Sequence, residues 1–575
     1  MALQMSESQL NSVERDKRVL DLYEQLAEIE QRLIPTGLHV FGRPSQSAEK
    51  ADLLRMIVSF DRTESNARAL ADLIVESLNL DQNEGNRSIL VDERIDSLVK
   101  QSIGEFINSG LAEAQSFLQR EANVPLHQSQ PIFNLLQDVS EQLKTNAELD
   151  SLIRALRGEF IEPGPGADIV QNPSVLPTGR NTHAINPYSV PSVASFSRSR
   201  VVAESLLERF KQERGAYPES MALVLWGLDN IKTQGDGVAQ ALWLLGVRPL
   251  RDALNRVTQV EPISLEELGR PRIDVVMTVS GIFRDLFSPT VQLLDRAVRL
   301  VARLDEPHDL NYVRKHAVEQ IESERCEMDD ACTRVFSNAP GNYGTNVNFM
   351  VMDSQWDREE SLGDLFVTRK CFAYGRDSRG QAIEGREARK AMDRALARVE
   401  ATYQNIDTFE IGLTDVDHYF EYLGAVSKAV EKRAQTRPAI YLSDSLSREV
   451  KIRSLEETVT LESRAKTLNP KWYEGMLKHG FRGVAEIENH VSNTFGWSAT
   501  ADAVGDWIYT EVAKTFVLDD AMLERLRGLN PHSAHSLVRR LLEANGRGYW
   551  DADPSALEKL RDISRSLEDQ LEGVA

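Results

Sequence analysis

The 575-residue sequence is poor in cysteine, has fewer basic than acidic side chains, and contains no long apolar run. Its three cysteines, Cys326, Cys332 and Cys371, are too few for a disulfide framework and lack the spacing of a zinc site, which favours a reducing compartment. Because no run of about 18 apolar residues occurs, we expect no membrane-spanning helix. The first residues carry no apolar segment of the kind that directs secretion. The net charge of −21 argues against non-specific nucleic-acid binding, which needs a basic surface, and we interpret the acidity mainly as a source of solubility.

The motifs of several common enzyme classes are also missing from the sequence. No GxxxxGK[ST] phosphate loop occurs, so we expect no ATP hydrolysis by the P-loop route. No GxGxxG follows a predicted strand, and neither a GxSxG elbow nor an HExxH helix is present. The candidates for chemistry are therefore the polar loops.

Chain length and hydrophobic patterning together predict a multi-domain protein. A prior of about 150 residues per domain suggests three or four domains. We predict a helix-rich α/β fold, with a parallel, doubly wound sheet flanked by helical N- and C-terminal regions. The predicted regions are 1–157, mainly helical; 158–216, an ordered Pro/Gly-rich loop with a connecting helix; 217–350, the α/β domain; 351–460, mixed helical; and 461–575, helical.

The predicted sheet begins with the apolar run MALVLW, which ends at Gly227 and is typical of a buried strand. The segment GDGVAQALWLLG then predicts a helix closed by Gly246. A second strand is predicted at 257–263 and a third in RIDVVMTVSG, followed by one helix in IFRDLFSPTVQLLDRAVRLVARL. Helices are also predicted at 12–34 and 385–403. In such sheets ligands bind beyond the carboxyl ends of the strands.

Polar and aromatic side chains follow two of these strands. Trp226, Asp229 and Lys232 come after the first strand, where Trp226 offers a flat apolar surface and Lys232 a cation. On chemistry alone, a strand-end turn with a core tryptophan explains this segment better. Arg284 follows the third strand, and Tyr343 lies in the loop FSNAPGNYG. We expect these loops to converge beside the sheet.

The Pro/Gly-rich segment also contains a compact polar group. The motif PTGRN followed by His183 places a guanidinium (Arg180), an amide (Asn181) and an imidazole within four residues. Arginine suits carboxylate recognition because its donors form a rigid fork. The alternative is that Arg180 and Asn181 bind loop backbone, and the residues alone favour that alternative.

The segment LTDVDHYF combines carboxylates with an imidazole. Asp415, Asp417 and His418 can hold a hard divalent cation or accept protons during a reaction. A surface helix that begins at a capping aspartate is the plainer interpretation.

Ten segments, taken in chain order, resemble the large (H) subunit family of magnesium chelatase. They are TGRNTHAINP, WGLDNIKTQG, LEELGRPRIDVVMTVSGIFRD, DLNYVRKH, FSNAPGNYG, FAYGR, GLTDVDHYF, LNPKWYEGMLKHG, GWSAT and EANGRGYW. The resemblance spans about Leu22 to Gly573, and its most informative part is Leu461–Thr500. The cobalt-inserting large subunits of cobalamin synthesis are similar around LEELGRPRID. Because THAINP, WGLDNIKT and ANGRGYW look more like the magnesium enzyme, we rank a cobaltochelatase second.

The resemblance implies a substrate, a metal and partners. The substrate is protoporphyrin IX, the inserted metal is Mg2+, and ATP is hydrolysed by two smaller AAA+ subunits, of the I and D type, rather than by this chain. The family's large subunit is far longer, and nothing like the HGxHGxxE segment of its other half occurs here. We therefore expect a C-terminal half that forms part of a porphyrin pocket in (bacterio)chlorophyll biosynthesis and is inactive without the missing half and the ATPase subunits. A non-catalytic porphyrin carrier or scaffold is the alternative.

With this resemblance the candidate residues acquire roles. The expected catalytic residues are Asp415, His418 and His183. The expected porphyrin-binding residues are Arg180, Asn181, Trp226, Asp229, Lys232, Arg284 and Tyr343, among which Arg180 would meet a propionate. No metal ligands are assigned. The expected location is the bacterial cytoplasm, or the plastid stroma of a phototrophic eukaryote.

Overall fold

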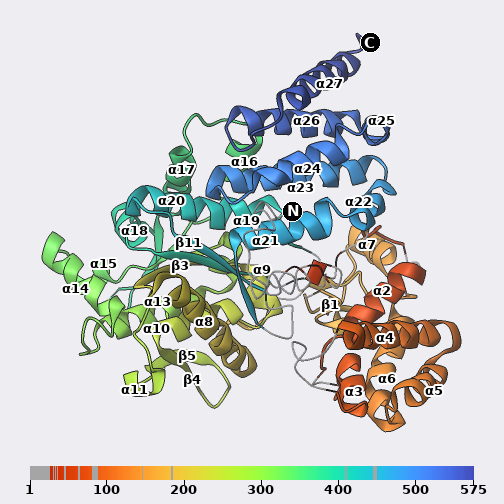
Figure 1. Cartoon of the computed structure of the whole chain (residues 1–575). Helices are drawn as coiled ribbons and strands as arrows, with labels where there is room; N and C mark the ends of the chain where they lie inside the picture. The colour runs from red at the N-terminus through yellow and green to blue at the C-terminus, as the bar shows by residue number, and fades with distance from the viewer. Residues whose placement is uncertain are drawn as a thin grey trace, which may run out of the picture.

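The computed structural model describes most of the chain, and Figure 1 shows its arrangement. The described residues are 22, 26, 28–29, 32, 34, 37–43, 47–62, 65–80, 89–145, 147–166, 168–182, 185–377, 379–406, 408, 411–444 and 450–574. His183 and most of the helix predicted at 12–34 lie outside them.

Helices α2 to α7 build the N-terminal region (Figure 1). Their bounds are α2 Ser47–Ile57, α3 Leu70–Ser77, α4 Ile89–Ser109, α5 Leu111–Ala122, α6 Leu126–Gln142 and α7 Glu148–Leu156. Helices α2 to α6 enclose a core of their own, in which Leu54, Leu73, Phe117 and Phe133 are buried. Helix α7 stands apart from that core, because only its first residue, Glu148, is buried.

The Pro/Gly-rich segment that follows is built from short elements. They are β1 Pro163–Gly164, η3 Pro173–Val175, β2 Asn181–Thr182 and η4 Pro187–Ser189, after which α8 Val193–Arg214 begins. Strand β1 pairs with β2 in parallel. The side chains of Asn172 and Asn186 each accept a hydrogen bond, both 3.1 Å long, from the backbone N–H two residues further on. These turns replace the backbone hydrogen bonds that proline cannot make.

An eight-stranded sheet occupies the centre of the molecule, in the order β12-β11-β10-β3-β6-β7-β8-β9. Its strands are β3 Ser220–Leu225, β6 Asp274–Val279, β7 Val335–Ser337, β8 Phe372–Arg376, β9 Ala382–Glu387, β10 Ala401–Ile406, β11 Ala439–Asp444 and β12 Lys451–Ser454. The strands from β11 to β7 are parallel to one another, and antiparallel pairs extend both edges. The predicted parallel, doubly wound sheet is confirmed, within a mixed sheet whose outer strands are antiparallel.

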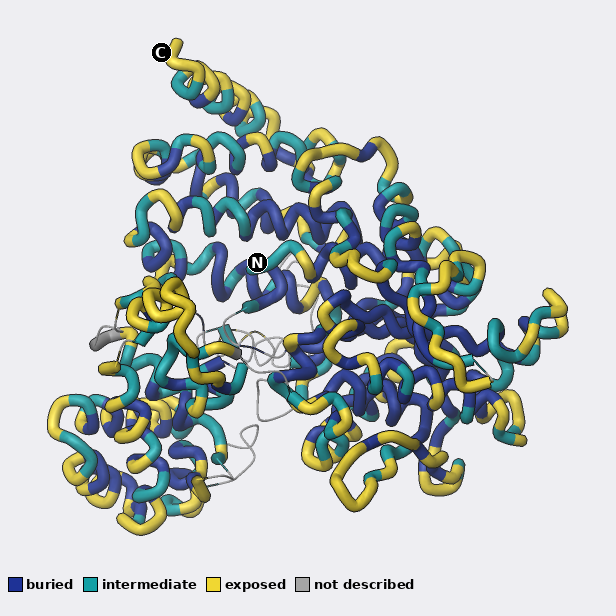
Figure 2. The backbone as a smooth tube through the Cα atoms, turned by 180° about the vertical axis from the view of Figure 1, so that it is seen from behind, coloured by how far each residue is buried: buried dark blue, intermediate teal, exposed yellow. Residues whose placement is uncertain are grey.

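Alternate residues of β3 face opposite sides of the sheet. Met221, Leu223 and Leu225 pack into the core beneath one face, whereas Ala222 and Val224 pack into the core of the C-terminal helices. The helices over the first face are α8, α10 Asp236–Leu245, α13 Ser288–Ala302 and α14 Tyr312–Glu324. Because both faces are covered, the strand is apolar from Met221 to Leu225. Figure 2 shows the same centre as the most buried part of the chain.

The second face is covered by helices that lie between the later strands or follow the last strand in the sequence, and the last of them are stacked above the sheet in Figure 1. These helices are α16 Val347–Met352, α17 Glu360–Lys370, α18 Arg389–Leu396, α19 Asp417–Tyr419, η5 Phe420–Gly424, α20 Ala425–Ala434, α21 Leu455–Glu462, η6 Ser463–Thr467, α22 Pro470–Leu477, α23 Phe481–Ala501, α24 Asp506–Phe516, α25 Asp520–Leu529, α26 Pro531–Gly546 and α27 Pro554–Glu572. Both η5 and η6 are π-helical turns. Such turns often occur where a helix contributes to a functional site.

The predicted second strand forms, but it lies in a different sheet. Strand β5 Val257–Pro262 pairs antiparallel with β4 Val247–Arg251 in a two-stranded sheet of their own. Only Val257 and Val260 of β5 are buried, whereas all six residues of β3 are. A strand with so little buried surface does not suit the centre of a sheet that is covered on both faces.

Two predicted helices are wrong in detail. The helix predicted after the third strand is divided at Phe287 into α12 Gly281–Leu286 and α13, which has Pro289 in its first turn. The helix predicted at 385–403 is instead the end of β9, then α18, then the start of β10. Every residue of β10 is buried, so its place in the sheet outweighs local helix propensity. Five strands of the sheet, β8 to β12, thus come from the stretch 351–460, for which the sequence predicts mixed helical structure.

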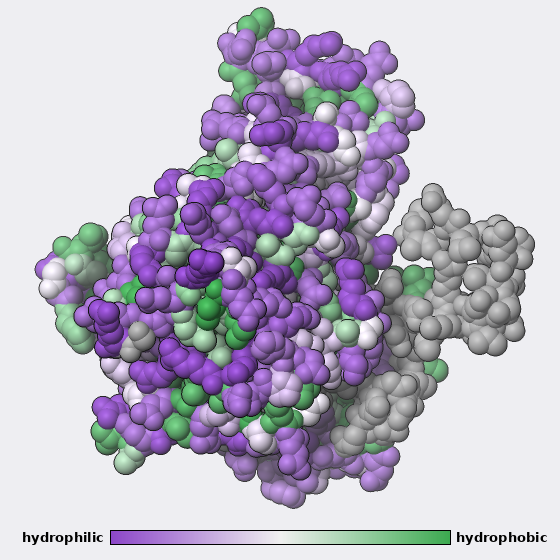
Figure 3. Space-filling view, turned by 90° about the vertical axis from the view of Figure 1, so that its left-hand side faces the viewer, coloured by the Kyte–Doolittle hydropathy of each residue, from purple (hydrophilic) through white to green (hydrophobic). Residues whose placement is uncertain are grey.

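The outer surface agrees with the acidic, polar composition. Within the described residues, no helix is both long and apolar enough to cross a membrane. The face shown in Figure 3 is mostly hydrophilic, and its apolar side chains occur in small groups. Isolated apolar side chains of this kind are normal on a folded protein.

Candidate functional site

The carboxyl ends of the parallel strands bring four loops to one edge of the sheet. Strand β3 leads into α9 Gly227–Lys232, β6 into α12, β7 into the loop 338–346, and β10 toward the segment 411–416. The Ser280 hydroxyl joins two of these loops, since its oxygen accepts hydrogen bonds from the N–H groups of Gly227 (3.2 Å) and Phe283 (3.1 Å). We call this group of loops, together with η5, the sheet edge. Ligands of open α/β sheets bind at such a position.

Arg284 holds the β7 loop in place at the sheet edge. Its guanidinium is buried, donates to both carboxylate oxygens of Asp285 (2.6 and 3.0 Å), and donates to three carbonyl groups of residues 338–342. It also lies 5.3 Å from the centre of the Tyr343 ring. The hydrogen bond from Arg284 lowers the pKa of Asp285, which in turn accepts the Tyr343 hydroxyl at 2.6 Å. The structure therefore brings Arg284 and Tyr343 together and leaves the Tyr343 ring exposed.

Lys370 is a fully buried cation that the sequence reasoning missed. Its ammonium donates to the Val279 carbonyl (2.6 Å) and to Oδ1 of Asn338 (3.1 Å), and lies 4.4 Å from the centre of the Tyr422 ring. Burial lowers the pKa of Lys370 to about 7, because its two hydrogen-bond acceptors are neutral. A lysine with such a pKa can gain or lose a proton near neutral pH, which is a common property of functional sites.

The charge of Glu421, a residue of η5, acts on Lys370, and its carboxylate binds the β7 loop. Its buried carboxylate accepts hydrogen bonds from the Thr345 hydroxyl (3.0 Å) and the Asn346 N–H (3.0 Å), and lies 2.9 Å from Nδ1 of His418. Burial alone would raise the pKa of Glu421, but the hydrogen bonds from His418 and Thr345 outweigh it and lower that pKa. The same contact with Glu421 raises the pKa of His418, whose side chain is 60% exposed. His418 is thus an accessible imidazole with a carboxylate behind it.

Asp415 belongs to a buried network rather than to an open surface. Its carboxylate lies 2.8 Å from Nε2 of His490 and also contacts the ammonium of Lys466. Burial favours the neutral acid, but attraction to Lys466 and His490 holds the pKa of Asp415 well below its usual range. The Trp472 ring lies 4.4 Å from the His490 ring, centre to centre. These contacts fix the position of Asp415.

The segment 411–416 is held by residues of the helices beneath it. The buried Glu462 accepts hydrogen bonds from the N–H groups of Leu413 (2.7 Å) and Thr414 (2.9 Å) and from the Thr414 hydroxyl (3.0 Å). Nδ2 of Asn493 donates to the Thr414 carbonyl, and the Trp497 indole donates to that of Leu413. Sequence reasoning missed Glu462, Lys466 and His490, although all three fall in the stretch Leu461–Thr500. The available signal was the richness of that stretch in polar residues at helical spacing.

The β3 loop contributes aromatic surface and two charged residues. The Trp226 ring is half-buried and lies 4.5 Å from the Tyr422 ring and 5.9 Å from the Tyr419 ring, centre to centre. Asp229 is buried and Lys232 half-buried on α9. The tryptophan therefore connects this loop with η5, as a core residue would, while part of its surface stays accessible.

Arg180 and Asn181 lie away from this group, and Figure 1 shows β1, with which Asn181 pairs, beside the N-terminal helices. The Arg180 guanidinium donates to the carbonyls of Ser174 (2.6 Å) and Leu176 (3.1 Å). Its Nε is buried and has no hydrogen-bond partner within the described part of the chain. Arg180 thus binds loop backbone, which is the alternative stated from the sequence, and its Nε–H remains as an unused hydrogen-bond donor. The roles assigned to Arg180, Asn181 and the undescribed His183 stay predictions.

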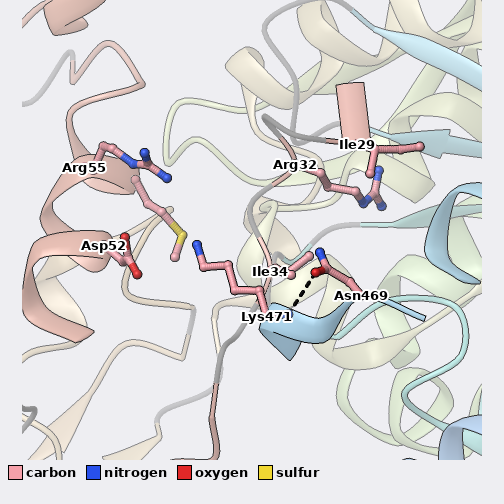
Figure 4. Close-up of a pocket in the computed structure, with 8 residues that line it drawn as sticks. Ile29, Arg32, Ile34, Asp52, Arg55, Asn469 and Lys471 are labelled. Atoms are coloured by element: carbon pink, nitrogen blue, oxygen red, sulfur yellow. Dashed lines mark hydrogen bonds between the residues drawn. The ribbon is translucent and has the colours of Figure 1, made fainter. Parts of the chain in front are cut away.

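Described residues line two hollows away from the sheet edge, and no predicted site residue lines either of these two. The first hollow has a volume of about 230 Å³ and lies between α2, the N-terminal segment and α22 (Figure 4). Its lining residues are Ile29, Arg32, Ile34, Asp52, Arg55, Met56, Asn469 and Lys471. The second, about 470 Å³, is lined by Glu204, Ser205, Glu208, Arg209, Gln212 and Ile452. The first is smaller than the pockets of roughly 300–1,000 Å³ that enclose drug-sized ligands. In the described part of the chain, no three or more His, Cys, Asp or Glu side chains are placed to hold a metal ion.

Comparison with known proteins finds a family model and relatives that match almost the whole chain. The family model described as CobN/Magnesium Chelatase matches residues 2–557. The chloroplastic magnesium-chelatase subunit ChlH of Oryza sativa subsp. indica is 42% identical over 599 residues, which cover 98% of this chain and 43% of that protein. The magnesium-chelatase H subunit of Cereibacter sphaeroides is 43% identical over 439 residues, covering 76% of this chain and 36% of that protein.

A solved structure agrees with the fold in detail. The catalytic subunit of cobaltochelatase from Mycobacterium tuberculosis matches with a TM-score of 0.91 at 33% identity, covering 97% of this chain and 47% of that chain. The chain thus spans less than half the length of each of these three relatives.

Proposed function

The chain belongs to the CobN/magnesium chelatase family, and from this premise we propose that it is the porphyrin-binding part of a chelatase large subunit. In this proposal it contributes to ATP-dependent insertion of Mg2+ into protoporphyrin IX, in (bacterio)chlorophyll biosynthesis. The observation that carries the proposal is the 42% identity to a magnesium-chelatase subunit across 98% of the chain. This chain corresponds to 43% of that protein, and in the proposal the complete activity requires further polypeptide.

The sheet edge supplies the chemistry that metal insertion requires. When Mg2+ enters the ring, the two pyrrole N–H groups lose their protons, so a base must stand close to the ring nitrogens. His418 is exposed, and Glu421 raises its pKa, so its imidazole can accept a proton near neutral pH. In this proposal, His418 accepts the two pyrrole protons one after the other and, because its side chain is exposed, releases each to solvent. Asp415, fixed by Lys466 and His490, keeps a negative charge in the segment that leads to His418.

The same edge offers a surface suited to a flat macrocycle. The Tyr343 ring is exposed and held by Asp285 and Arg284, and part of the Trp226 ring is accessible. Rigid aromatic rings bind flat apolar ligands with little loss of side-chain entropy. In the proposal, Tyr343 and Trp226 contact the ring, and Asp229 and Lys232 contact its polar rim. The remainder of the large subunit completes the enclosure.

ATP hydrolysis is assigned to partners rather than to this chain. The sequence has no phosphate loop, and Mg2+ gives up its water shell reluctantly, so insertion into four nitrogens needs an external source of free energy. We propose that AAA+ ATPase subunits of the I and D type supply it. In the proposal, Mg2+ and protoporphyrin IX are substrates.

A cobalt-inserting large subunit is the second candidate. It is favoured by the TM-score of 0.91 to a cobaltochelatase subunit. The identity to that protein, 33%, is lower than the 42% and 43% found for the two magnesium-chelatase subunits, so we place it second.

The test is reconstitution with a histidine variant. The chain is co-expressed with the segment of the rice subunit that lies outside the matched region, then mixed with both ATPase subunits, ATP, protoporphyrin IX and either Mg2+ or Co2+. We expect Mg2+-dependent product, and we expect His418→Gln to lower its rate about 100-fold while porphyrin binding, followed by fluorescence quenching, is unchanged. His127→Gln, an exposed histidine of α6, is the matched control.

Each outcome separates the candidates. Product with Co2+ alone favours the cobalt-inserting subunit. Porphyrin binding without product in any mixture favours a carrier or scaffold. Product at an unchanged rate with His418→Gln removes His418 from the mechanism.

A further inference from the structure

Helix α7 exposes an apolar stripe where most helices bury one. Leu149, Leu152, Ile153 and Leu156 occupy positions i, i+3, i+4 and i+7 and so share one face of the helix. Their exposed fractions are 49%, 46%, 46% and 80%. Among the described residues of this molecule, the other exposed apolar side chains do not form a complete stripe on a single helix. Figure 2 shows α7 almost entirely in the colour of exposed residues.

Neighbouring segments extend this stripe into a patch. Phe160, just beyond the helix, is 75% exposed, and the turn that contains Val40 and Phe41 is exposed as well. That turn lies against the helix, because a side chain added at Gly42 would meet the Leu149 side chain at 2.6 Å. We call the surface formed by these seven side chains the α7 patch: Val40, Phe41, Leu149, Leu152, Ile153, Leu156 and Phe160. Contiguous apolar surface of this kind marks interaction sites on soluble proteins.

Contacts of its first residue hold α7 in place, although its apolar face is exposed. Glu148 is buried and accepts hydrogen bonds from the Gly42 N–H (2.6 Å), with Nε2 of His39 at 2.9 Å from the same carboxylate. At the other end, the Arg154 guanidinium donates to the Phe160 carbonyl at 2.7 Å. The patch is therefore presented in a defined orientation, and binding to it costs little ordering of the chain.

The charges around α7 and on the whole chain limit which partners can bind the α7 patch. The charged residues on and next to α7 are Glu148, Asp150, Arg154, Arg157 and Glu159, which sum to −1. A helix that binds anionic membranes carries a basic polar face, and this one does not. A second copy of the chain also carries a net charge of −21, which opposes close association of two copies.

The lengths of the relatives indicate a third candidate, besides a membrane and a second copy, for the partner that binds the α7 patch. The chain accounts for 43% of the rice subunit and 47% of the mycobacterial chain, so in both proteins more than half of the polypeptide is joined to the equivalent of this chain. We propose that the α7 patch is the docking surface for that remaining part of the large subunit. The inference rests on the proposed function, because it takes this chain to be one portion of such a subunit.

The test uses co-expression with paired variants. The tagged 575-residue chain is co-expressed with the segment of the rice subunit that lies outside the matched region, and the amount of that segment that co-purifies is measured. We expect stoichiometric recovery with the unaltered chain and a recovery about tenfold lower or less with L152E/I153E, as for central interface residues. The control is Leu254→Glu, a leucine that is 73% exposed and lies outside α7. Because the replaced side chains are half-exposed, circular dichroism and Tm should match those of the unaltered chain.

A second measurement examines the helix directly. A nine-residue helix with little burial exchanges its amide hydrogens rapidly in the isolated chain. Bound to the partner segment, the amides of residues 149–157 should become protected. Unchanged exchange in a stable complex would overturn the docking site.

The outcomes distinguish this inference from the proposed function. Equal recovery of L152E/I153E and the unaltered chain overturns the docking site, even if chelation is restored. Loss of recovery with the double variant but no chelation under any condition supports the docking site and counts against the proposed function. Absence of recovery with the unaltered chain overturns the inference. Sedimentation that shows a dimer of the chain alone, abolished by L152E/I153E, makes a second copy the occupant and also overturns it.

Discussion

The sheet edge and helix α7 place their side chains in opposite ways. At the sheet edge and in the helices that contact it, charged groups are buried: Lys370, Glu421 and Glu462 are each enclosed by partners from distant parts of the chain. On α7, apolar groups are exposed, and Leu156 is 80% accessible to solvent. Both regions depart from the ordinary distribution, in which charges are at the surface and apolar groups inside.

Buried charges and exposed apolar side chains respond differently to substitution. A buried charge is tolerated only when its hydrogen bonds are made, so removing one partner at the sheet edge should destabilise the fold. An exposed leucine is solvated in both the folded and the unfolded chain, so changing it should hardly affect stability. We therefore expect substitutions at the sheet edge to alter folding, and substitutions on α7 to alter association.

The largest effect is expected for Glu462→Ala. The substitution leaves the N–H groups of Leu413 and Thr414 and the Thr414 hydroxyl buried without their acceptor. We expect the free energy of unfolding to fall by about 3 kcal/mol, measured by urea denaturation. Glu456→Ala, an exposed glutamate of the same helix, should behave like the unaltered chain. If the two variants unfold at the same urea concentration, the buried carboxylate of Glu462 does not contribute to stability, and the contrast between the two regions is wrong.

A pH-dependent effect is expected for Lys370→Met. In the folded chain the pKa of Lys370 is about 7, whereas an unfolded lysine titrates near 10.5, so between these values only the unfolded chain holds the proton. Lys370 therefore makes stability rise with pH from about 7 to about 10, and its cost to the folded chain is greatest below about 7. In Tm measurements, the methionine variant should gain most over the unaltered chain near pH 6 and least near pH 9.5.

The control for that experiment is Lys390→Met, an exposed lysine of α18, which should follow the unaltered chain at every pH. Parallel curves for Lys370→Met and the unaltered chain would mean that Lys370 does not change its protonation state on unfolding.

A smaller effect is expected for Thr345→Val. The change keeps the shape of the buried side chain but removes the hydroxyl that donates to Glu421 at 3.0 Å and accepts from the Val347 N–H at 3.2 Å. We expect a loss of about 1 kcal/mol in the free energy of unfolding. The exposed Thr145→Val should show none. A loss as large as that of Glu462→Ala would indicate that the β7 loop depends on this hydroxyl more than its two hydrogen bonds explain.

The smallest effect on stability is expected for Leu156→Glu. Because Leu156 is largely exposed, Tm should stay within error of the unaltered chain, while the binding of an apolar fluorescent dye should decrease. Leu254→Glu serves as the comparison, since it removes an exposed leucine outside the α7 patch. A clear drop in Tm for Leu156→Glu would show that α7 packs against the chain more closely than its exposure indicates.

Much of the fold could be predicted from the sequence because its signals are local. The apolar runs that became β3 and β6 and the Gly246 cap of α10 are defined by a few consecutive residues. The prediction failed where position in the sheet decided the outcome: the start of β10 was taken for helix, and β5 was placed in the wrong sheet. The burial that separates these cases depends on neighbours far along the chain.

The candidate site was only partly accessible to the same reasoning. Arg284, Tyr343, Trp226, Asp415 and His418 were noticed because they stand in Gly-rich or charged loops, and the structure groups them at the sheet edge. A further set of buried residues was not noticed, because their burial depends on partners that are distant in the sequence: Lys370, Glu421, Glu462, Lys466 and His490. They lie within helices and turns, where charged residues normally face solvent.

By itself the sequence determined the family, the helix-rich α/β class and the absence of a phosphate loop, since each depends on the order and type of nearby residues. The tertiary structure alone decided which charges share an environment and which apolar face stays open. Lys370 meets the carbonyl of Val279, 91 positions away, and Asp415 meets His490 across the packing of separate helices. Burial and hydrogen bonding are properties of what surrounds a side chain in space, and only the folded chain specifies that surrounding.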